Sequence, residues 1–296
     1  MSRLPSACRR PWRGATHGLA AFAVAALGSV AQSAEPPAAP AVFDEVPFIT
    51  TPDHVTVAML ELAAVGPADH VIDLGSGDGR IVITAARRFG ARGLGVEIVP
   101  ELVERSRAAA RAAGVADRAE FRTQDLFETD LAPATVVTMY LLPEVNLQLR
   151  PRLLALAPGT RIVSHDYDLG DWRPDRTLTL PAPEKTVGRE KLSRLHLWTV
   201  PARVQGLWCG AGGLALRIEQ RFQVGSATLE QGPEQRALQA VLDGRTMRLL
   251  GAAGSAWTLR SEDAGLVVLA GPSGLPMFAG QRLVPAPAGG CPPAAG

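Results

Sequence analysis

The sequence has few aromatic residues, few cysteines and no excess of charge of either sign. Phe, Trp and Tyr make up 5% of its 296 residues, and 30 basic residues against 29 acidic ones give a net charge of +1. Because no excess of basic residues creates a positive surface potential, the chain is not expected to bind nucleic acid. Three cysteines and five histidines show no metal-ligand spacing, so no metal site is predicted. Apolar residues still reach 47%, which allows a packed core and excludes disorder across the whole chain.

The first 34 residues depart from this balance and contain an apolar run that is short for a membrane span. Arginines up to Arg13, with no acidic residue before Glu35, precede about 14 uncharged residues from Gly18 to Ala31. A bilayer span needs roughly 20 apolar residues, whereas a signal-peptide core is shorter. We therefore expect residues 1–34 to be a signal peptide or a membrane anchor. Export would place a bacterial protein in the periplasm, whereas a wrongly assigned start codon would leave it cytoplasmic.

The cysteines leave two alternatives open. Cys8 would leave with a cleaved signal, and Cys209 and Cys291 would remain. In an exported protein these two could form a disulfide. Two unrelated thiols fit the sequence equally well.

Short apolar runs and amphipathic segments alternate between residues 45 and 200. Thr51 is expected to cap a helix that has Pro52 at its first position. The pattern predicts strands at 70–74, 93–98, 119–123, 134–140 and 161–165, with helices at 78–89, 100–113 and 143–156. Such alternation predicts an α/β fold, a mainly parallel sheet with helices on both faces. We assign residues 45–200 to this domain and 35–44 to a linker.

After residue 200 the apolar pattern changes to a period of two. Asp243-Gly244 and the stretch from Asp263 to Gly265 are typical hairpin turns. We assign residues 201–287 to a small antiparallel β domain for packing or partner binding, and 288–296 to a flexible tail. Alternate apolar positions predict a half-buried strand at Leu214, Leu216, Ile218, Phe222 and Val224.

A glycine-rich segment, Val71–Arg80, carries the functional signal. It reads Val-Ile-Asp-Leu-Gly-Ser-Gly-Asp-Gly-Arg, a strand that turns into a helix at Gly75, Ser76, Gly77, Asp78 and Gly79. Glycine allows the backbone to approach a ligand where a Cβ atom would collide. In an open α/β sheet, ligands bind at the carboxyl ends of the strands, where this turn lies.

Spacing and charge separate two ligand classes for this turn. Dinucleotide enzymes use Gly-x-Gly-x-x-Gly, which places a pyrophosphate on the helix N-terminus. Here the glycines are spaced one residue closer, and Asp73 and Asp78 would repel a pyrophosphate. A ligand with a sulfonium and an ammonium group would be attracted instead. The segment therefore predicts binding of S-adenosylmethionine (SAM) and argues against a nicotinamide oxidoreductase.

Further candidate ligands to SAM follow the next two strands. Glu97 stands 24 residues after Asp73 and can accept both ribose hydroxyls. Asp125 is placed to meet the adenine amino group and Leu126 to cover its ring. Each residue also has a structural alternative. Asp78 could only favour a helix N-terminus, Glu97 could be a solvated strand end, and Asp125 could cap a loop.

In these motifs the chain resembles the class I SAM-dependent methyltransferases over about residues 45–180. Within that class, Pro47–Pro52, the segment from Asp73 to Val82, Val163–Asp166 and Trp172–Pro174 resemble a narrower group of protein-lysine methyltransferases. That group acts on the mitochondrial ATP synthase c subunit and the ADP/ATP carrier and has bacterial relatives. The resemblance implies a Rossmann-like seven-strand sheet and a methyl acceptor that is a protein lysine, in a membrane protein for the known members. The group's Tyr-Val-Pro before the first helix is Phe48-Ile49-Thr50 here.

Tyr140 is the candidate catalytic residue, because it ends the fourth predicted strand, a position that faces the reacting methyl in methyltransferases. Its phenol could accept a hydrogen bond from an amine, or it could only pack against the cofactor. A lysine has a pKa near 10.4, which desolvation would lower, so no strong base is required. His165 and Asp166 are weaker candidates and are expected to be a satisfied strand-end pair.

A second hypothesis is an exported SAM-binding or degenerate module that acts through partner contacts of the β domain.

Overall fold

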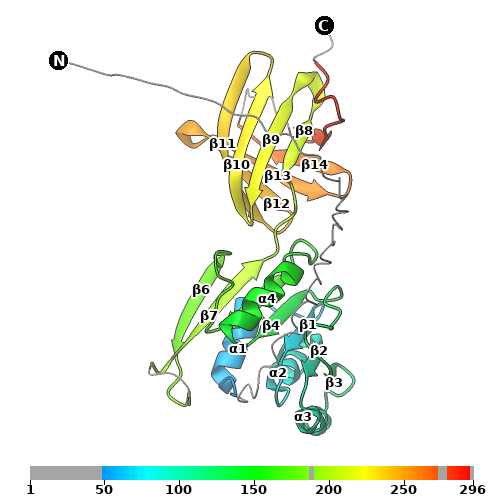
Figure 1. Cartoon of the computed structure of the whole chain (residues 1–296), viewed down its shortest axis with the longest axis vertical. Helices are drawn as coiled ribbons and strands as arrows, with labels where there is room; N and C mark the ends of the chain where they lie inside the picture. Colours follow the sequence, from blue (N-terminus) through cyan, green and yellow to red (C-terminus); the bar gives the residue numbers. More distant parts are fainter. Residues whose placement is uncertain (1–48, 187–189, 273–278, 294–296) are drawn as a thin grey trace, which may run out of the picture. The chain divides into compact units, whose positions relative to one another are not determined.

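The computed structural model of this chain describes residues 49–186, 190–272 and 279–293. These residues form a seven-stranded sheet flanked by helices and a closed eight-stranded barrel (Figure 1). No helix in this part of the chain has both the length and the apolar character that crossing a bilayer requires. The expected signal or anchor (1–34) and the linker (35–44) lie outside the described residues.

The seven-stranded sheet is the predicted Rossmann-like sheet, in the order β3-β2-β1-β4-β5-β7-β6. The first five strands in sequence run parallel, and β7 is antiparallel to both of its neighbours. The strand order reverses between β1 and β4, which is where ligands bind in sheets of this type. The strands are β1 (His70–Leu74), β2 (Arg92–Glu97), β3 (Ala119–Thr123), β4 (Val136–Met139), β5 (Arg161–His165), β6 (Arg176–Pro181) and β7 (Leu192–Thr199).

Helices cover both faces of this sheet, as the alternating pattern predicts. The helices are α1 (Asp53–Leu62), α2 (Arg80–Phe89), α3 (Pro100–Ala112) and α4 (Pro143–Leu153). Apolar side chains of α1 and α2 pack with Val71 and Val136, and α3 packs beside α2 against Phe121. On the other face α4 packs on Ile72 and Val137. Burial of these apolar surfaces is the main stabilising contribution to the sheet.

Thr51 does not cap α1, contrary to the prediction. Pro52 occupies the cap position and no side chain bonds to the first helical turn. The Thr51 hydroxyl instead lies 3.1 Å from Nδ1 of His165, at the end of β5. A tertiary hydrogen bond to a buried imidazole has replaced the local one.

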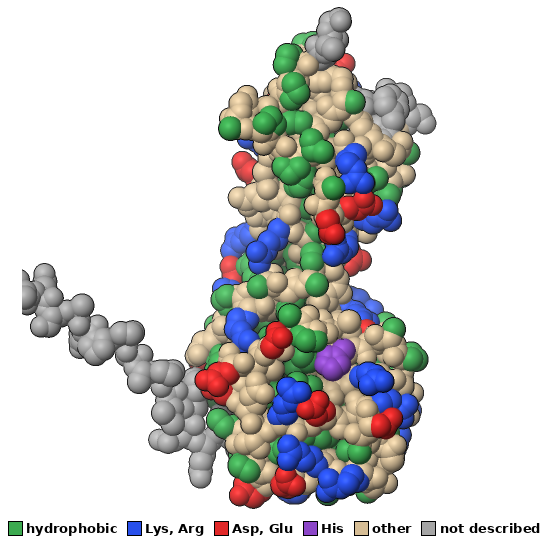
Figure 2. Space-filling model, turned by 90° about the vertical axis from the view of Figure 1, so that its right-hand side faces the viewer, with side chains coloured by type: hydrophobic (Ala, Val, Ile, Leu, Met, Phe, Trp, Pro, Cys, Tyr) green, Lys and Arg blue, Asp and Glu red, His purple; other side chains and the backbone are tan. Residues whose placement is uncertain are grey.

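Figure 2 shows one face of the molecule, with acidic and basic side chains interspersed rather than gathered by sign. On this face no region forms a single-sign field of the kind that nucleic acid binding uses.

The β domain is a closed antiparallel barrel in which each strand pairs with the next and β15 pairs with β8. Its interior is filled by apolar side chains, including Leu216, Leu249 and Trp257. Eight strands enclose an interior just wide enough for such side chains. The strands are β8 (Gly206–Cys209), β9 (Ala215–Arg221), β10 (Val224–Gln231), β11 (Glu234–Asp243), β12 (Thr246–Leu250), β13 (Ala256–Glu262), β14 (Gly265–Ala270) and β15 (Arg282–Pro285).

Two residues of the predicted apolar strand do not face the barrel interior. Phe222 adopts φ 55° in the turn between β9 and β10, and its ring lies 5.9 Å from that of Trp172. Val224 begins β10 and is half exposed. The turn interrupts the period of two after Ile218, so the prediction is wrong for these two positions.

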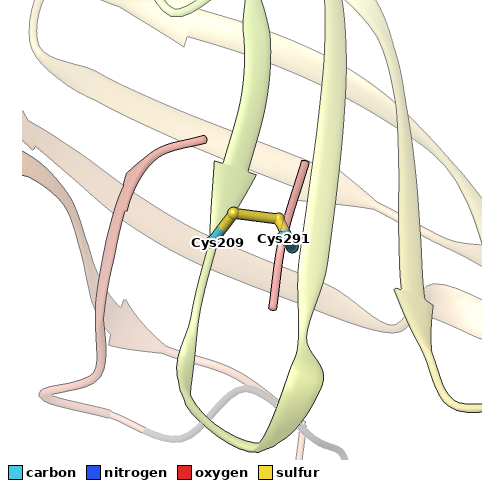
Figure 3. The surroundings of a disulfide bond; sticks show 2 residues. All are labelled: Cys209 and Cys291. Atoms are coloured by element: carbon cyan, nitrogen blue, oxygen red, sulfur yellow. A yellow bond between two sulfur atoms is a disulfide. The ribbon is translucent and has the colours of Figure 1, made fainter. Parts of the chain in front are cut away.

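Cys209 and Cys291 form a disulfide, which settles the alternative that the sequence leaves open (Figure 3). Cys209 ends β8, and Cys291 follows the last strand, 82 residues later. The tail predicted to be flexible from residue 288 is therefore anchored to the barrel at this position.

Candidate active site

The turn after β1 is built from three glycines in left-handed conformations. Gly75, Gly77 and Gly79 have φ angles of 71°, 55° and 78°, a region that favours glycine. The N–H groups of Gly75 and Ser76 donate to the carbonyl of Val96 in β2, at 3.0 and 2.9 Å. A Cβ atom on Gly79 would lie 2.6 Å from the Phe121 ring. The turn is thus fixed against β2, and side chains are disfavoured at its three glycine positions.

Glu97, at the end of β2, is bonded to the same turn. Its Oε2 accepts from the Gly77 N–H at 3.0 Å, and its Oε1 accepts from Ile98 and Val99 at 2.9 and 3.1 Å. A carboxylate offers about four acceptor positions, so capacity remains for a ligand hydroxyl. Glu97 is therefore an ordered strand end joined to the glycine turn.

Asp73 is a buried carboxylate at the centre of the parallel sheet. Its Oδ1 accepts a hydrogen bond from the Thr138 hydroxyl of β4 at 2.7 Å. Burial raises the pKa of Asp73 to about 7, the hydrogen bond opposes this rise, and the charges of Glu97 and Asp78 add to it. A cation bound nearby would stabilise the ionised form and lower this pKa.

Asp78 has its own positive partner, Arg80. The guanidinium of Arg80 donates to both carboxylate oxygens, with Nη2 2.6 Å from Oδ2. Burial raises the pKa of Asp78, but the hydrogen bonds and charge of Arg80 outweigh it and bring this pKa below its usual value. Arg80 also donates to the Thr51 carbonyl at 2.7 Å. The sequence reasoning missed this pairing. It neutralises Asp78, one of the two carboxylates that the sequence analysis assigned to the positive charges of SAM.

Asp125 and Leu126 follow β3, next to the end of β2. The Gln124 N–H donates to the Glu97 carbonyl at 2.9 Å, which holds the two strand ends together. Oδ1 of Asp125 accepts from the Phe127 N–H at 2.7 Å, so Asp125 makes the loop-capping contact that the sequence allows as an alternative. Leu126 packs partly buried against the core.

Ile98 was missed by the sequence reasoning, although it follows Glu97 directly. Its side chain is 68% exposed, the most exposed large apolar side chain of the described residues. An exposed apolar side chain directly after the strand-end acid Glu97 is available to pack against a planar ring of a bound ligand.

Tyr140, the candidate catalytic residue, lies directly after β4 beside the glycine turn. The next residue, Leu141, fills the space that a Cβ on Gly75 would need, at 2.9 Å. The Tyr140 hydroxyl donates to Oδ2 of Asp166 at 3.1 Å, and its ring centroid lies 4.0 Å from that of His165. Burial, followed by the Asp166 charge, raises the pKa of the Tyr140 phenol. Tyr140 is therefore a neutral phenol whose proton points to Asp166.

His165 is fully buried and bonded on both sides. Nδ1 lies 3.1 Å from the Thr51 hydroxyl and Nε2 lies 2.8 Å from the Ser193 hydroxyl. Burial lowers the pKa of His165 to about 4, so the ring is neutral at physiological pH. Its contacts are those of a satisfied core histidine that supports the Tyr140 ring.

Asp166 follows His165 with a φ of 66°, which is uncommon for a residue with a side chain. Its Oδ1 accepts from the Arg194 N–H at 3.1 Å, and its Oδ2 lies 2.5 Å from Nζ of Lys185. Burial raises the pKa of Asp166, but hydrogen bonding to Lys185 and the neighbouring positive charge outweigh it and lower this pKa. Asp166 is therefore an ionised group beside Tyr140, and the sequence reasoning missed its partner Lys185.

Comparisons with known proteins agree with this geometry. The family model described as the ANTKMT methyltransferase domain matches residues 73–176, from Asp73 to the start of β6. A protein-lysine N-methyltransferase of Saccharolobus islandicus is 45% identical over 135 residues, which are 45% of this chain and 84% of that protein. The mouse adenine nucleotide translocase lysine N-methyltransferase is 35% identical over 132 residues, 44% of this chain and 57% of that protein.

A solved structure is also similar in sequence. The RNA methyltransferase of Salinibacter ruber, in complex with S-adenosyl-L-homocysteine, is 54% identical, with a TM-score of 0.48. The similarity covers 53% of this chain and 96% of that one. The chain spans little more than half the length of the mouse relative named above.

Proposed function

Because this chain belongs to the SAM-dependent methyltransferase family that includes protein-lysine N-methyltransferases, we propose that its methyl acceptor is a lysine amine of a protein. The observation that carries this proposal is the Tyr140–Asp166 pair, which lies beside the glycine turn. An ionised carboxylate suits a lysine that arrives as an ammonium, and a neutral phenol oxygen can accept a hydrogen bond from the same lysine when it reacts as an amine.

The residues around the glycine turn fit SAM as the cofactor. Asp73 offers a buried negative charge to its ammonium group, and the backbone from Gly75 to Gly79, which has no side chain at its three glycines, admits its chain. We assign Glu97 to the ribose, and Asp125, Leu126 and Ile98 to the adenine. We keep Asp78 in the cofactor site, but because its charge is paired with Arg80, we assign it no direct charge contact with SAM. When bound, SAM supplies an electrophilic methyl group on a sulfonium.

The chain's own residues then prepare the amine. Asp166 binds the incoming ammonium by its charge and orients it beside Tyr140 when that ammonium replaces Lys185 as the partner of the carboxylate. The Asp166 side chain is only 13% exposed, and shielding of the amine from solvent favours its neutral form. Reaction then depends mainly on alignment at short distance. The Tyr140 oxygen accepts an N–H of the amine while its own O–H continues to donate to Asp166. His165 moves no proton, because it is neutral and bonded at both nitrogens.

The test is transfer of labelled methyl from SAM by the purified full chain. Membrane proteins, soluble proteins and RNA of the source cell are offered as separate fractions. We expect label on lysines of protein, and none with Glu97→Ala. Label on RNA alone would contradict the lysine assignment. SAM binding by calorimetry without transfer to any fraction would instead favour a binding module that acts through the barrel.

We also propose that the protein is exported or held outside the cytoplasm. The Cys209–Cys291 disulfide supports this, because such bonds form and persist in oxidising compartments. The basic and then apolar N-terminus has the layout of an export signal. N-terminal sequencing of the protein isolated from its source should give a start near residue 35 or a membrane-bound full chain. An intact Met1 in the soluble cytoplasmic fraction, with both thiols reduced, would contradict the proposal.

A further inference from the structure

Lysine is rare in this chain, and both lysines lie in one loop. Of the 30 basic residues only Lys185 and Lys191 are lysines, and both fall between β6 and β7. β7 runs antiparallel to β5, so its start pairs with the end of β5, with Leu195 opposite His165. The loop that leads into β7 therefore lies at the edge of the sheet where Tyr140 and Asp166 lie.

Lys185 reaches the Tyr140–Asp166 pair with its amine. Nζ lies 2.5 Å from Oδ2 of Asp166, the same oxygen that accepts from the Tyr140 hydroxyl at 3.1 Å. Nζ also donates to the Leu192 carbonyl at 2.8 Å. The Lys185 side chain is only 11% exposed. A lysine ammonium of the chain itself thus occupies the position that the proposed function gives to the acceptor.

We propose that Lys185 is a methyl acceptor within its own chain, modified in cis at Nζ. This inference rests on the proposed function, because it uses the same site and the same reaction. One proton first leaves Nζ for water, and the nitrogen lone pair then forms the N–C bond. The S–C bond breaks, and its electron pair returns to sulfur and leaves a neutral thioether. The product is a methylammonium, so the ion pair with Asp166 is retained.

The contacts of Lys185 also set the extent of methylation. An ammonium has three N–H donors, and two oxygens of the described residues, Oδ2 of Asp166 and the Leu192 carbonyl, accept from Nζ. One methyl group leaves a donor for each of these acceptors. A second methyl would remove one of the two hydrogen bonds in a largely buried position, which is unfavourable. The expected product is monomethyl-lysine.

Lys191 serves as the internal control. Its Nζ donates to the backbone carbonyl of Lys185 and not to the Asp166 carboxylate. It has the same chemistry and lies in the same loop, but it lacks the contact with the Tyr140–Asp166 pair. If Lys185 is modified and Lys191 is not, the difference comes from the position of Lys185 beside Asp166 and not from a general reactivity of lysine amines.

The experiment is peptide mass spectrometry of the full chain, both as isolated from cells and after incubation with methyl-labelled SAM. We expect one methyl group on Lys185 and none on Lys191. Lys191→Arg should keep the modification, and Lys185→Arg, which retains the positive charge beside Asp166, should lose it. Glu97→Ala should be unmodified as isolated. Calorimetry with SAM is the control for folding, and Lys185→Arg should bind SAM as the parent does.

Three outcomes would overturn the inference. They are an unmodified Lys185 in protein that methylates other proteins, equal labelling of both lysines, and a rate per molecule that rises with protein concentration. The first leaves the proposed function intact. Absence of transfer to any acceptor, with Lys185 unmodified as isolated, would overturn the proposed function as well.

Discussion

The α/β domain and the barrel bury different kinds of side chain. All of the buried polar or charged residues among those described, from Thr51 to Ser193, belong to the α/β part, and they include Asp73, Thr138 and His165. The buried side chains of the barrel are apolar. Buried polar groups lower stability unless they are hydrogen-bonded, so they are expected where chemistry requires them. The difference indicates that one region carries the chemistry and the other is built for stability.

The largest expected effect compares two glycines with similar backbone angles, one in each region. Gly79→Ala places a Cβ 2.6 Å from the Phe121 ring at φ 78°, whereas Gly254, in the barrel at φ 75°, has open space around it. We expect Gly79→Ala to lower the free energy of unfolding by about 3 kcal/mol and to abolish SAM binding. Gly254→Ala should cost about 1 kcal/mol and leave binding unchanged. Denaturant unfolding and calorimetry measure both, and equal losses in the two variants would contradict the comparison.

The second prediction removes the covalent bond of the barrel. Replacing Cys209 and Cys291 together by serine should lower the free energy of unfolding by about 3 kcal/mol, because the bond closes a long loop. The affinity for SAM should not change if the barrel contributes stability and only the α/β domain binds the cofactor. Chemical denaturation and calorimetry of the double variant test this. A weakened SAM affinity would show that the barrel contributes to the site.

The third prediction concerns the buried carboxylate Asp73. With its pKa at about 7, Asp73 is mostly protonated at pH 6 and ionised at pH 8. Affinity for the cationic cofactor should therefore rise about tenfold between these values. Because the folded-state pKa lies above the ordinary value of 3.8, the stability of the free protein should fall as the pH rises from about 4 to about 7.

Asp73→Asn is the matched control for this pH dependence, because the amide has the same shape and no charge. Its SAM affinity should be weak and lack the rise near pH 7, and its melting temperature at pH 8 should exceed that of the unliganded parent. An unchanged pH profile in the variant would show that another group titrates.

The smallest effect is expected for Tyr140→Phe. Loss of one hydrogen bond to the amine, about 1 kcal/mol, should lower kcat about fivefold. SAM affinity should be unchanged, because Tyr140 lies on the acceptor side. Single-turnover kinetics with a lysine acceptor measure the rate, and an unaltered rate would leave Tyr140 with a packing role only.

Local patterns predicted the α/β domain well and the long-range contacts poorly. The strands at 70–74, 119–123 and 161–165 begin and end as predicted, because short apolar runs or alternating apolar and polar residues determine them. By contrast, the closure of the barrel by β15 and β8 depends on pairing between distant segments, which no local period encodes. For the same reason the contacts of Thr51 with His165 and of Lys185 with Asp166 were missed. The acidic residues were identified from charge and spacing, but the neutralisation of Asp78 by Arg80 needed side-chain geometry.

The disulfide changes how a mechanical load would pass through the molecule. Cys209 lies at the end of the first barrel strand, and Cys291 follows the last. A pulling force applied at the two chain ends would pass from residue 209 through the sulfur atoms to residue 291. The stretch between them would carry no tension, so the pairings among β9 to β15 would stay closed until the bond was reduced. A protease cut inside that stretch would likewise leave both pieces joined.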